Sequence, residues 1–429
     1  MSQFLDALAK ENGTKFLIYP QNKKLRGFEQ PELIYVNQTP GSIKAGPEDD
    51  KTYVVDAIDK LQYKFQGEGP PYLGARYPSV EPNKEGHFDH IRPGTRAFSC
   101  TVMYATVRRV LDIWEDYFGH KIQWYFYRDL SKLELIPRVE WNNAQSGYGF
   151  LEFGFSHNSD GGIDHSNPYC ENFDVLGHEV GHLIKNSTIG WPESKNKETR
   201  EYRAHHESFG DLVAIVSVMH FESVINHILK YTNGNLFSLN ELSRMGELSQ
   251  ATEIRRAFND KKMSSVDSPE EEHILSEPFT GGAFDILVEM FQHNLIERGL
   301  ISEELGKRAY DAHYGEVPEV QEEFNQCYQG KEDEFQKALL DARDYFGKLM
   351  ATAWSKTSPD NLSFGKVLHN IIEADRELNE GKYEKVILDC FNWREIIPAT
   401  DDSRTLLYTH VVDKLAPFST DKIMHQDFE

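Results

Sequence analysis

Residues 173–184, Phe-Asp-Val-Leu-Gly-His-Glu-Val-Gly-His-Leu-Ile, are the stretch on which the prediction of fold and function depends. Their apolar residues recur at helical spacing, which predicts an amphipathic helix. Residues four positions apart on a helix lie one turn above each other, so His178 and His182 point the same way. Two such imidazoles can take two corners of a zinc tetrahedron, with Glu179 beside them as a candidate base. The alternative is a core helix with two incidental histidines.

A catalytic zinc site needs a third protein ligand and leaves its fourth position open for water. Glu207 is the candidate, because it lies on the next predicted helix, opposite the apolar stripe. Asp211 follows one turn later on the same face. A ligating histidine usually donates its other ring N–H to a carboxylate, and Asp211 is placed to accept that bond from His178. The alternative is a pair of exposed acids. We expect the neighbouring His205 and His206 to face solvent.

The chain is rich in strand signals before this helix and in helix signals after it. We expect a helix from 95 to 119, a strand over 122–127, two strands joined around 146–147, and a later helix over 284–295. The pattern predicts an α+β fold with a β-rich N-terminal lobe and a helical C-terminal lobe, and the active-site helix lies between them. The predicted divisions are an N-terminal extension of mixed strands and loops at 1–94, the β-rich lobe at 95–190, the helical lobe with the third zinc ligand at 191–400, and a C-terminal tail at 401–429.

Composition argues against several classes of function. The chain has 429 residues, of which 39% are hydrophobic, as expected for a globular protein with two or three lobes. Its net charge of −23 argues against nucleic acid or an anionic membrane as a partner. No apolar run is long enough to span a membrane, and no secretory signal is visible, so the default expectation is a cytoplasmic protein. Unconventional secretion and the oligomeric state are left open. The four cysteines form no Cys-x-x-Cys pair and are typical of reduced thiols.

The order His178-Glu179-x-x-His182 and Glu207-x-x-x-Asp211 resembles the gluzincin signature of thermolysin-like zinc metallopeptidases. The resemblance implies a thermolysin-like fold, one catalytic Zn²⁺, and a peptide or protein as the substrate. The roles that it implies are zinc ligation by His178, His182 and Glu207, general-base catalysis by Glu179, and orientation of His178 by Asp211.

Two further matches extend the resemblance over about residues 95–395. Asn143-Ala144 is similar to the family's edge strand, which implies that these two residues hold the substrate backbone. His273 resembles the histidine that donates a hydrogen bond to the transition-state oxyanion. Tyr202 is the candidate for the family's second oxyanion donor, a tyrosine.

The sequence also departs from the secreted members of this family. An insertion around 191–200 lengthens the gap between the second histidine and Glu207. Asp174 matches a family calcium ligand, but Val218 stands where its acidic partner is expected, which leaves the Ca²⁺ site incomplete. The signal and the long pro-segment are missing, which predicts a relative other than a secreted digestive protease. Two alternative functions are a non-catalytic binding protein with a gluzincin fold and a narrow-specificity protease that acts on one partner protein.

Overall fold

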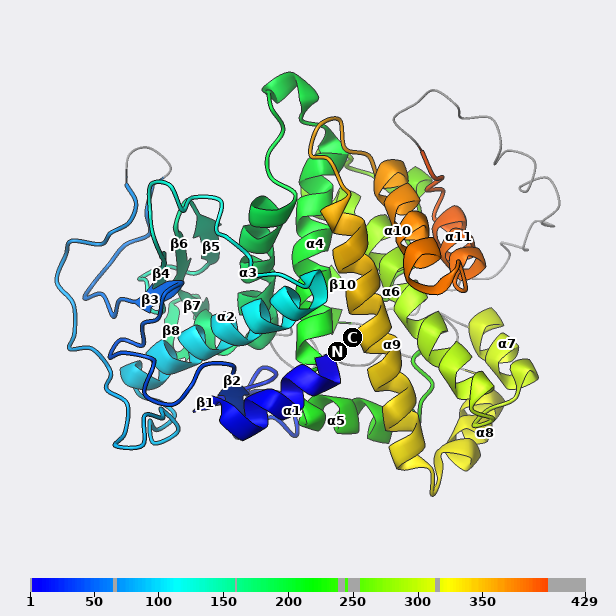
Figure 1. The fold of residues 1–429 in the computed structure, drawn as a ribbon, viewed down its shortest axis with the longest axis horizontal. Helices are drawn as coiled ribbons and strands as arrows, with labels where there is room; N and C mark the ends of the chain where they lie inside the picture. Colours follow the sequence, from blue (N-terminus) through cyan, green and yellow to red (C-terminus); the bar gives the residue numbers. More distant parts are fainter. Residues whose placement is uncertain are drawn as a thin grey trace.

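A computed structural model describes residues 2–64, 68–158, 160–237, 244–245, 255–312 and 317–399. The predicted C-terminal tail at 401–429 lies outside these described residues. Figure 1 shows a mixed α+β architecture, with the small sheets on one side and most helices on the other. The helices are α1 (Ser2–Asn12), α2 (Arg96–Phe118), α3 (Phe173–Thr188), α4 (Arg200–Val218), α5 (Glu222–Thr232), α6 (Glu272–Glu297), α7 (Glu303–Asp311), α8 (Pro318–Tyr328), α9 (Glu332–Ser355), α10 (Phe364–Asn379) and α11 (Glu384–Trp393).

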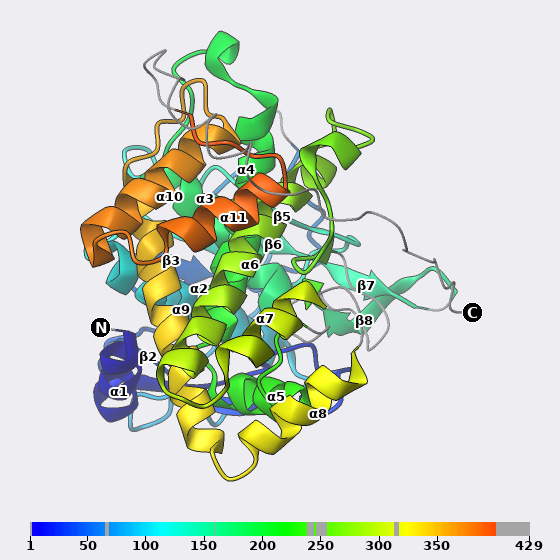
Figure 2. The same cartoon turned by 90° about the vertical axis from the view of Figure 1, so that its right-hand side faces the viewer.

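Small sheets flank α3 on the side away from the helical part (Figure 1). The strands are β1 (Thr14–Ile18), β2 (Glu32–Val36), β3 (Thr52–Val54), β4 (Leu133–Ile136), β5 (Ala144–Gly147), β6 (Phe150–Phe153), β7 (Phe155–His157), β8 (Ile163–Pro168), β9 (Arg244–Met245) and β10 (Arg255–Arg256). The largest sheet among the described residues has the order β3-β4-β6-β5, which places β5 at an edge. Figure 2 shows the β7–β8 hairpin extending away from the body of the molecule.

The predicted strand pair around 146–147 is present as the β5–β6 hairpin. Gly147 pairs with Phe150, so Tyr148 and Gly149 form a two-residue turn. Gly149, the second residue of the turn, has a φ of 85°, a left-handed conformation that glycine adopts without steric cost. β5 and β6 are antiparallel, whereas β4 is parallel to both β3 and β6.

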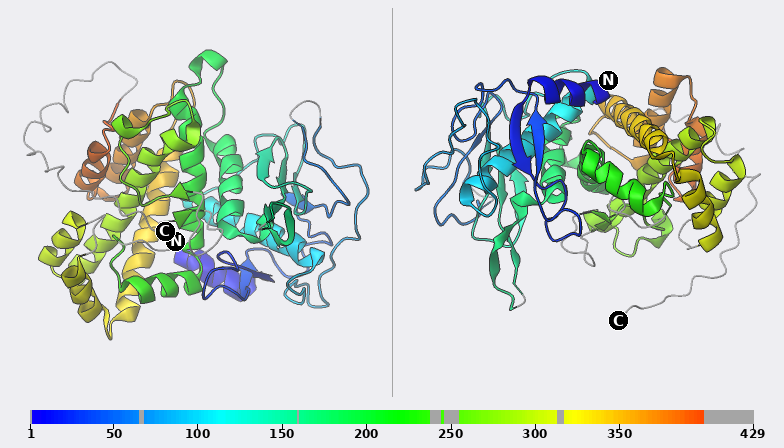
Figure 3. Two further views of the ribbon diagram at one scale, coloured as in Figure 1. Left: turned by 180° about the vertical axis from the view of Figure 1, so that it is seen from behind. Right: turned by 90° about the horizontal axis from the view of Figure 1, so that it is seen from below.

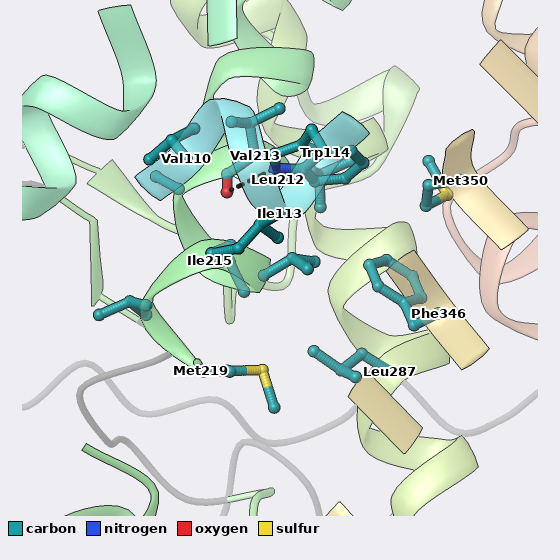
Figure 4. Packing of buried hydrophobic residues seen from close by; sticks show 14 of the residues in the cluster. Val110, Ile113, Trp114, Leu212, Val213, Ile215, Met219, Leu287, Phe346 and Met350 are labelled. Carbon is teal, nitrogen blue, oxygen red and sulfur yellow. Dashed lines mark hydrogen bonds between the residues drawn. The ribbon is translucent and has the colours of Figure 1, made fainter. Parts of the chain in front are cut away.

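The helical part is built around α4. It packs against α3 on one side and α6 on the other, and α6 in turn packs against α9. Figure 4 shows the apolar side chains that α2, α4, α6 and α9 contribute to the core. Within this core, the ring centroids of Trp114 and Trp354 lie 5.1 Å apart, and Trp114 Nε1 donates to Ser217 Oγ at 3.1 Å. Tilted aromatic pairs of this kind add to the stability that burial of the two rings provides.

The N-terminal residues belong to the same core. Phe16 of β1 stacks on Phe88 with ring centroids 4.9 Å apart, and it also contacts Tyr104 of α2. β3, at residues 52–54, pairs with β4 in the sheet that ends at β5. α1, which the sequence analysis did not predict, packs against α2, β2 and α9 (Figure 3).

Two predicted elements differ from the structure. Residues 122–127 form no strand: residues 122–124 are irregular, and turns begin at Tyr125, where Tyr127 N donates to Trp124 O and Asp129 N donates to Phe126 O. The helix predicted over 284–295 begins at Glu272, twelve residues earlier. Pro278 and two glycines suggest a break there, but burial of the segment in the core outweighs its weak helix propensity. The helix predicted from 95 to 119 is confirmed as α2, with Thr95 as its N-cap.

Within the described ranges, no single helix is long and apolar enough to cross a membrane. Taken together, α4 and α5 reach the length and apolar composition of a membrane-spanning segment, but the chain bends by 92° between them.

Candidate metal centre

α3 brings the two histidines of the motif together. Its N-cap, Asn172, accepts hydrogen bonds from the amides of Asp174 and Val175, which fixes the start of the helix. His178 and His182 are both buried, and their ring centroids lie 4.4 Å apart. His178, Glu179 and His182 each offer one ligand atom, and these atoms all lie within 4.8 Å of one another. The helical spacing therefore produces the cluster that the sequence predicts.

Glu207 of α4 completes a three-residue donor set. Its Oε2 lies 3.4 Å from His178 Nε2, and its Oε1 lies 3.6 Å from His182 Nε2. Two ligand atoms that share one tetrahedral zinc ion at bonds of about 2.1 Å lie about 3.4 Å apart. The observed separations match this value, so His178, His182 and Glu207 could hold one metal ion.

The ring planes provide a second test of fit. A metal ion bound to an imidazole lies close to the ring plane, along the lone pair of one nitrogen. The rings of His178 and His182 meet at 80°, so their planes cross near the rings and one ion can lie in both. His206 stacks on His182 at 14° with centroids 4.1 Å apart, and its plane runs nearly parallel to that of His182. His206 also offers a ligand atom within 4.8 Å of those of His182 and Glu207. Its ring is nearly parallel to that of His182, which is a poor orientation for binding one ion together with it.

A close approach of α3 and α4 permits this convergence. A side-chain Cβ on Gly181 would lie 2.7 Å from Gly210 Cα, and a Cβ on Gly210 would lie 2.8 Å from His178 Nδ1. Real Cβ atoms do not approach other atoms so closely, so both positions require glycine at this helix spacing. The two glycines let Glu207 reach the histidines of α3.

Asp211 lies where the sequence predicts it. Its Oδ1 is 2.8 Å from His178 Nδ1, and the carboxylate is almost completely buried. A proton on Nδ1 is then held by the carboxylate, and Nε2 keeps the lone pair that faces Glu207. Asp211 therefore sets the tautomer of His178 that a metal ligand requires.

The charge state of Glu207 suits a cation. Burial by itself raises the pKa of this carboxyl, but His182, His178 and His273 together lower that pKa well below its usual value. Glu207 is therefore ionised at neutral pH, and an ionised carboxylate is the form that binds metal ions.

His273 lies at the rim of the centre, on the first turn of α6. Its Nε2 is 3.2 Å from Glu207 Oε2, and its Nδ1 is 2.5 Å from Glu271 Oε1. About half of the side chain, 49%, is exposed. His273 thus lies beside the predicted metal ligand while one side of its ring remains open to solvent.

The predicted substrate strand lies beside α3. β5 begins at Ala144, forms an edge of the four-stranded sheet, and contacts α3. Asn143 Oδ1 accepts a hydrogen bond from Ala144 N at 2.9 Å, and Asn143 O accepts from Gly154 N. An edge strand near a catalytic centre can pair with the backbone of an extended peptide.

Tyr202 does not face the metal ligands, which corrects the prediction that it is an oxyanion donor. Its hydroxyl donates to Gly190 O at 3.0 Å, and only 3% of the residue is exposed. The ring lies 3.6 Å from Nζ of Lys185, which also donates to Tyr202 O. Burial lowers the pKa of Lys185 well below its usual value. Tyr202 and Lys185 thus join α4 to the end of α3.

His205 and His206 also differ from the prediction, because neither of them faces open solvent. His205 is completely buried, and its ring contacts Phe209 and Phe279. His206 is partly buried on His182, and its Nε2 lies 3.3 Å from Asn186 Oδ1. Burial lowers the pKa of both histidines well below the usual value, so both are neutral at neutral pH. His206 is the residue of the centre that the sequence analysis missed.

No protein-family model matches this chain, and no curated protein sequence matches it. One similar solved structure is the precursor of protealysin, a metalloproteinase from Serratia proteamaculans. The similarity covers 84% of this chain and 91% of that chain, with 11% sequence identity and a TM-score of 0.45. A similarity at this level carries no functional argument, so any functional conclusion must come from the side chains themselves.

Proposed function

We propose that this protein is a zinc-dependent endopeptidase of the thermolysin-like type. The observation that carries the proposal is the convergence of His178, His182 and Glu207, with the separations and ring planes that one tetrahedral ion needs. Glu179 supports it further, because its carboxylate belongs to the same cluster as the two histidines. Two imidazoles and one carboxylate form a donor set typical of catalytic zinc sites, which leave a position open for water.

The residues of the chain then have distinct tasks. When bound, the zinc ion supplies Lewis acidity that activates a water molecule and polarises the substrate carbonyl. Glu179 takes a proton from the attacking water onto its carboxylate and passes it to the leaving amine. His273 donates from Nε2 to the developing oxyanion, a contact worth about 3 kcal/mol in other enzymes. The peptide backbone is held along β5, with Asn143 and Ala144 at the start of that strand.

A metal and activity assay tests the proposal directly. We expect the protein to retain about one zinc per chain after purification and to cleave internal bonds of denatured protein substrates. Removing the metal with a chelator should abolish cleavage, and adding back stoichiometric zinc should restore it. Protein without bound zinc, even after reconstitution, would contradict the proposal.

Two other results would point to the alternative functions. Stoichiometric zinc without cleavage of any member of a diverse peptide mixture would favour a non-catalytic binding protein. Cleavage restricted to one or a few sequences would favour a narrow-specificity protease. Mass spectrometry of the digested mixture separates these results, because it reports every cleaved bond.

Asp211→Asn provides a test of how His178 is held. The amide keeps the shape of the carboxylate but loses its charge, so it supports the His178 tautomer less strongly. We expect zinc affinity to fall by about 10- to 100-fold, measured by competition with a chromophoric chelator. Asp375→Asn is the matched control, because Asp375 is equally buried but lies on α10. There it accepts hydrogen bonds from the Tyr345 hydroxyl and the Tyr383 amide. Unchanged zinc affinity in Asp211→Asn would contradict the assigned role.

A further inference from the structure

A row of aromatic rings leads away from the candidate metal centre. His206 stacks on His182, and the ring of Trp191 lies 6.5 Å from that of His206. Tyr125 follows at 6.4 Å from Trp191, and Tyr148 follows at 5.6 Å from Tyr125. Each ring therefore contacts the next, from a predicted zinc ligand to the turn between β5 and β6.

The row bridges the two elements that border the predicted substrate path. The Tyr125 hydroxyl donates to the carbonyl of Gly147, the last residue of β5, at 3.1 Å. On the other side, Tyr125 N donates to Ser187 Oγ at the end of α3. Tyr125 is thus fixed to both β5 and α3, so the row occupies a defined position between the edge strand and the helix that carries the histidines.

Two of these rings are open to solvent although they are large and apolar. Trp191 is 58% exposed and Tyr148 is 48% exposed, whereas Tyr125 is partly buried beneath them. Contiguous exposed aromatic side chains in a folded protein are typical of surfaces that bind a partner. We call Tyr125, Tyr148 and Trp191 the aromatic wall.

The loop that carries Trp191 is anchored. Asp360 Oδ1 accepts a hydrogen bond from Glu193 N at 2.8 Å. Lys197 Nζ lies 2.6 Å from carboxylate oxygens of both Glu193 and Asp360. The two contacts with Asp360 therefore tie this insertion to the loop before α10. A ring on an anchored loop is positioned in advance, which reduces the entropy lost when a ligand binds to it.

We propose that the aromatic wall is a subsite for an aromatic or large aliphatic side chain of the peptide substrate. The proposal rests on the proposed function, because the wall is continuous with the candidate centre through His206. A peptide strand placed along β5 points alternate side chains to one face, so a single side chain near Gly147 can reach the wall. An apolar side chain gains there by covering rings that are otherwise exposed to water.

The wall predicts a measurable preference at one substrate position. In a digest of a diverse peptide mixture, we expect Phe, Tyr, Trp or Leu to be enriched at one fixed distance from the cleaved bond. For a matched peptide pair with Phe or Ser at that position, kcat/KM should differ by about tenfold, as expected for one apolar contact. Trp191→Ala should reduce this difference to less than about twofold, because the Phe side chain loses its apolar contact.

Tyr127→Ala is the matched control. Tyr127 is 48% exposed and lies two residues from Tyr125. Its ring contacts the guanidinium of Arg128 instead of the aromatic wall. The substrate preference should therefore persist in this variant. An unchanged preference in Trp191→Ala, or a wild-type digest without any aromatic or aliphatic enrichment, would overturn the subsite.

Binding measurements separate this proposal from the proposed function. The labelled Phe and Ser peptides are titrated into zinc-loaded Glu179→Gln protein, where hydrolysis does not interfere. We expect about tenfold tighter binding of the Phe peptide, and loss of that difference when Trp191→Ala is added. Failure of the wild type to hydrolyse any peptide would overturn the enzyme proposal alone, whereas equal binding of both peptides would overturn the subsite alone. Dimer dissociation caused by Trp191→Ala, without a change in peptide preference, would assign the wall to self-association and overturn the subsite.

Discussion

Glu179→Gln is expected to lower kcat/KM for peptide hydrolysis by about 10²- to 10⁴-fold while the protein keeps its zinc. The amide has nearly the same shape as the carboxylate, so α3 and the two histidines should stay in place. It cannot accept a proton from water at neutral pH, so the proton transfer that accompanies attack is lost. Glu179 lies beside the two histidines but is not one of the three proposed zinc ligands. The variant should therefore lose activity without losing zinc.

The measurement compares zinc per chain and initial cleavage rates in the same preparations. Glu222→Gln is a suitable control, because it makes the same chemical change at an exposed position at the start of α5. The control should match the wild type in both quantities. A Glu179→Gln variant with full activity would exclude Glu179 as the base.

Glu207→Ala is expected to remove stoichiometric zinc, a larger loss than the roughly 10- to 100-fold weakening predicted for Asp211→Asn. The change deletes one of the three donors and leaves two histidines on a single helix. It also removes the negative charge that both imidazoles face at 3.4 and 3.6 Å. Peptide hydrolysis should disappear together with the metal.

Thermal unfolding gives this variant a readout that does not depend on activity. A ligand that binds only the folded protein, and is present at a concentration of 100 times its Kd, adds about 2.7 kcal/mol to the free energy of unfolding. Zinc should therefore raise the melting temperature of the wild type but not that of Glu207→Ala. An equal zinc-dependent rise in both proteins would show that the metal binds elsewhere.

Part of the candidate donor set could be predicted from sequence because it depends on local helix geometry. His178 and His182 lie on one face of any regular helix, and Asp211 follows Glu207 by the same one-turn spacing. The capping residue Asn172 and the apolar stripe define α3 without reference to distant contacts. Helix periodicity therefore places each pair on one face of its helix, whereas the meeting of the two pairs depends on the close packing of α3 on α4 at Gly181 and Gly210.

Tyr202 was selected only because it is the tyrosine nearest to Glu207 in the sequence, and proximity in sequence does not fix the direction of a side chain. The helix begins at Arg200, so Tyr202 lies within it, five residues before Glu207. At 3.6 residues per turn, five residues correspond to about 140° around the axis, which directs the two side chains to different sides. The spacing within α4 therefore separates Tyr202 from the predicted site.

His206 could not be placed by the same reasoning, because its burial depends on how α3 and the 191–200 segment pack against α4. Its ring is covered by His182 on one side and lies near Trp191, and Asn186 of α3 contacts its Nε2. The false strand over 122–127 has a similar origin. Its alternating pattern suits a half-buried strand, but the backbone makes local turn hydrogen bonds instead.

The close contact of α3 and α4 also has a consequence for how the protein folds. The three proposed donors lie within residues 178–207, on two helices that are consecutive in the chain. Contacts between such near neighbours form early, since little loop-closure entropy is lost in making them. The donor set can therefore assemble in one helical hairpin before β5 and the aromatic wall are in place. A metal ion held by the three proposed donors would link α3 to α4 and so stabilise the native pairing of the two helices.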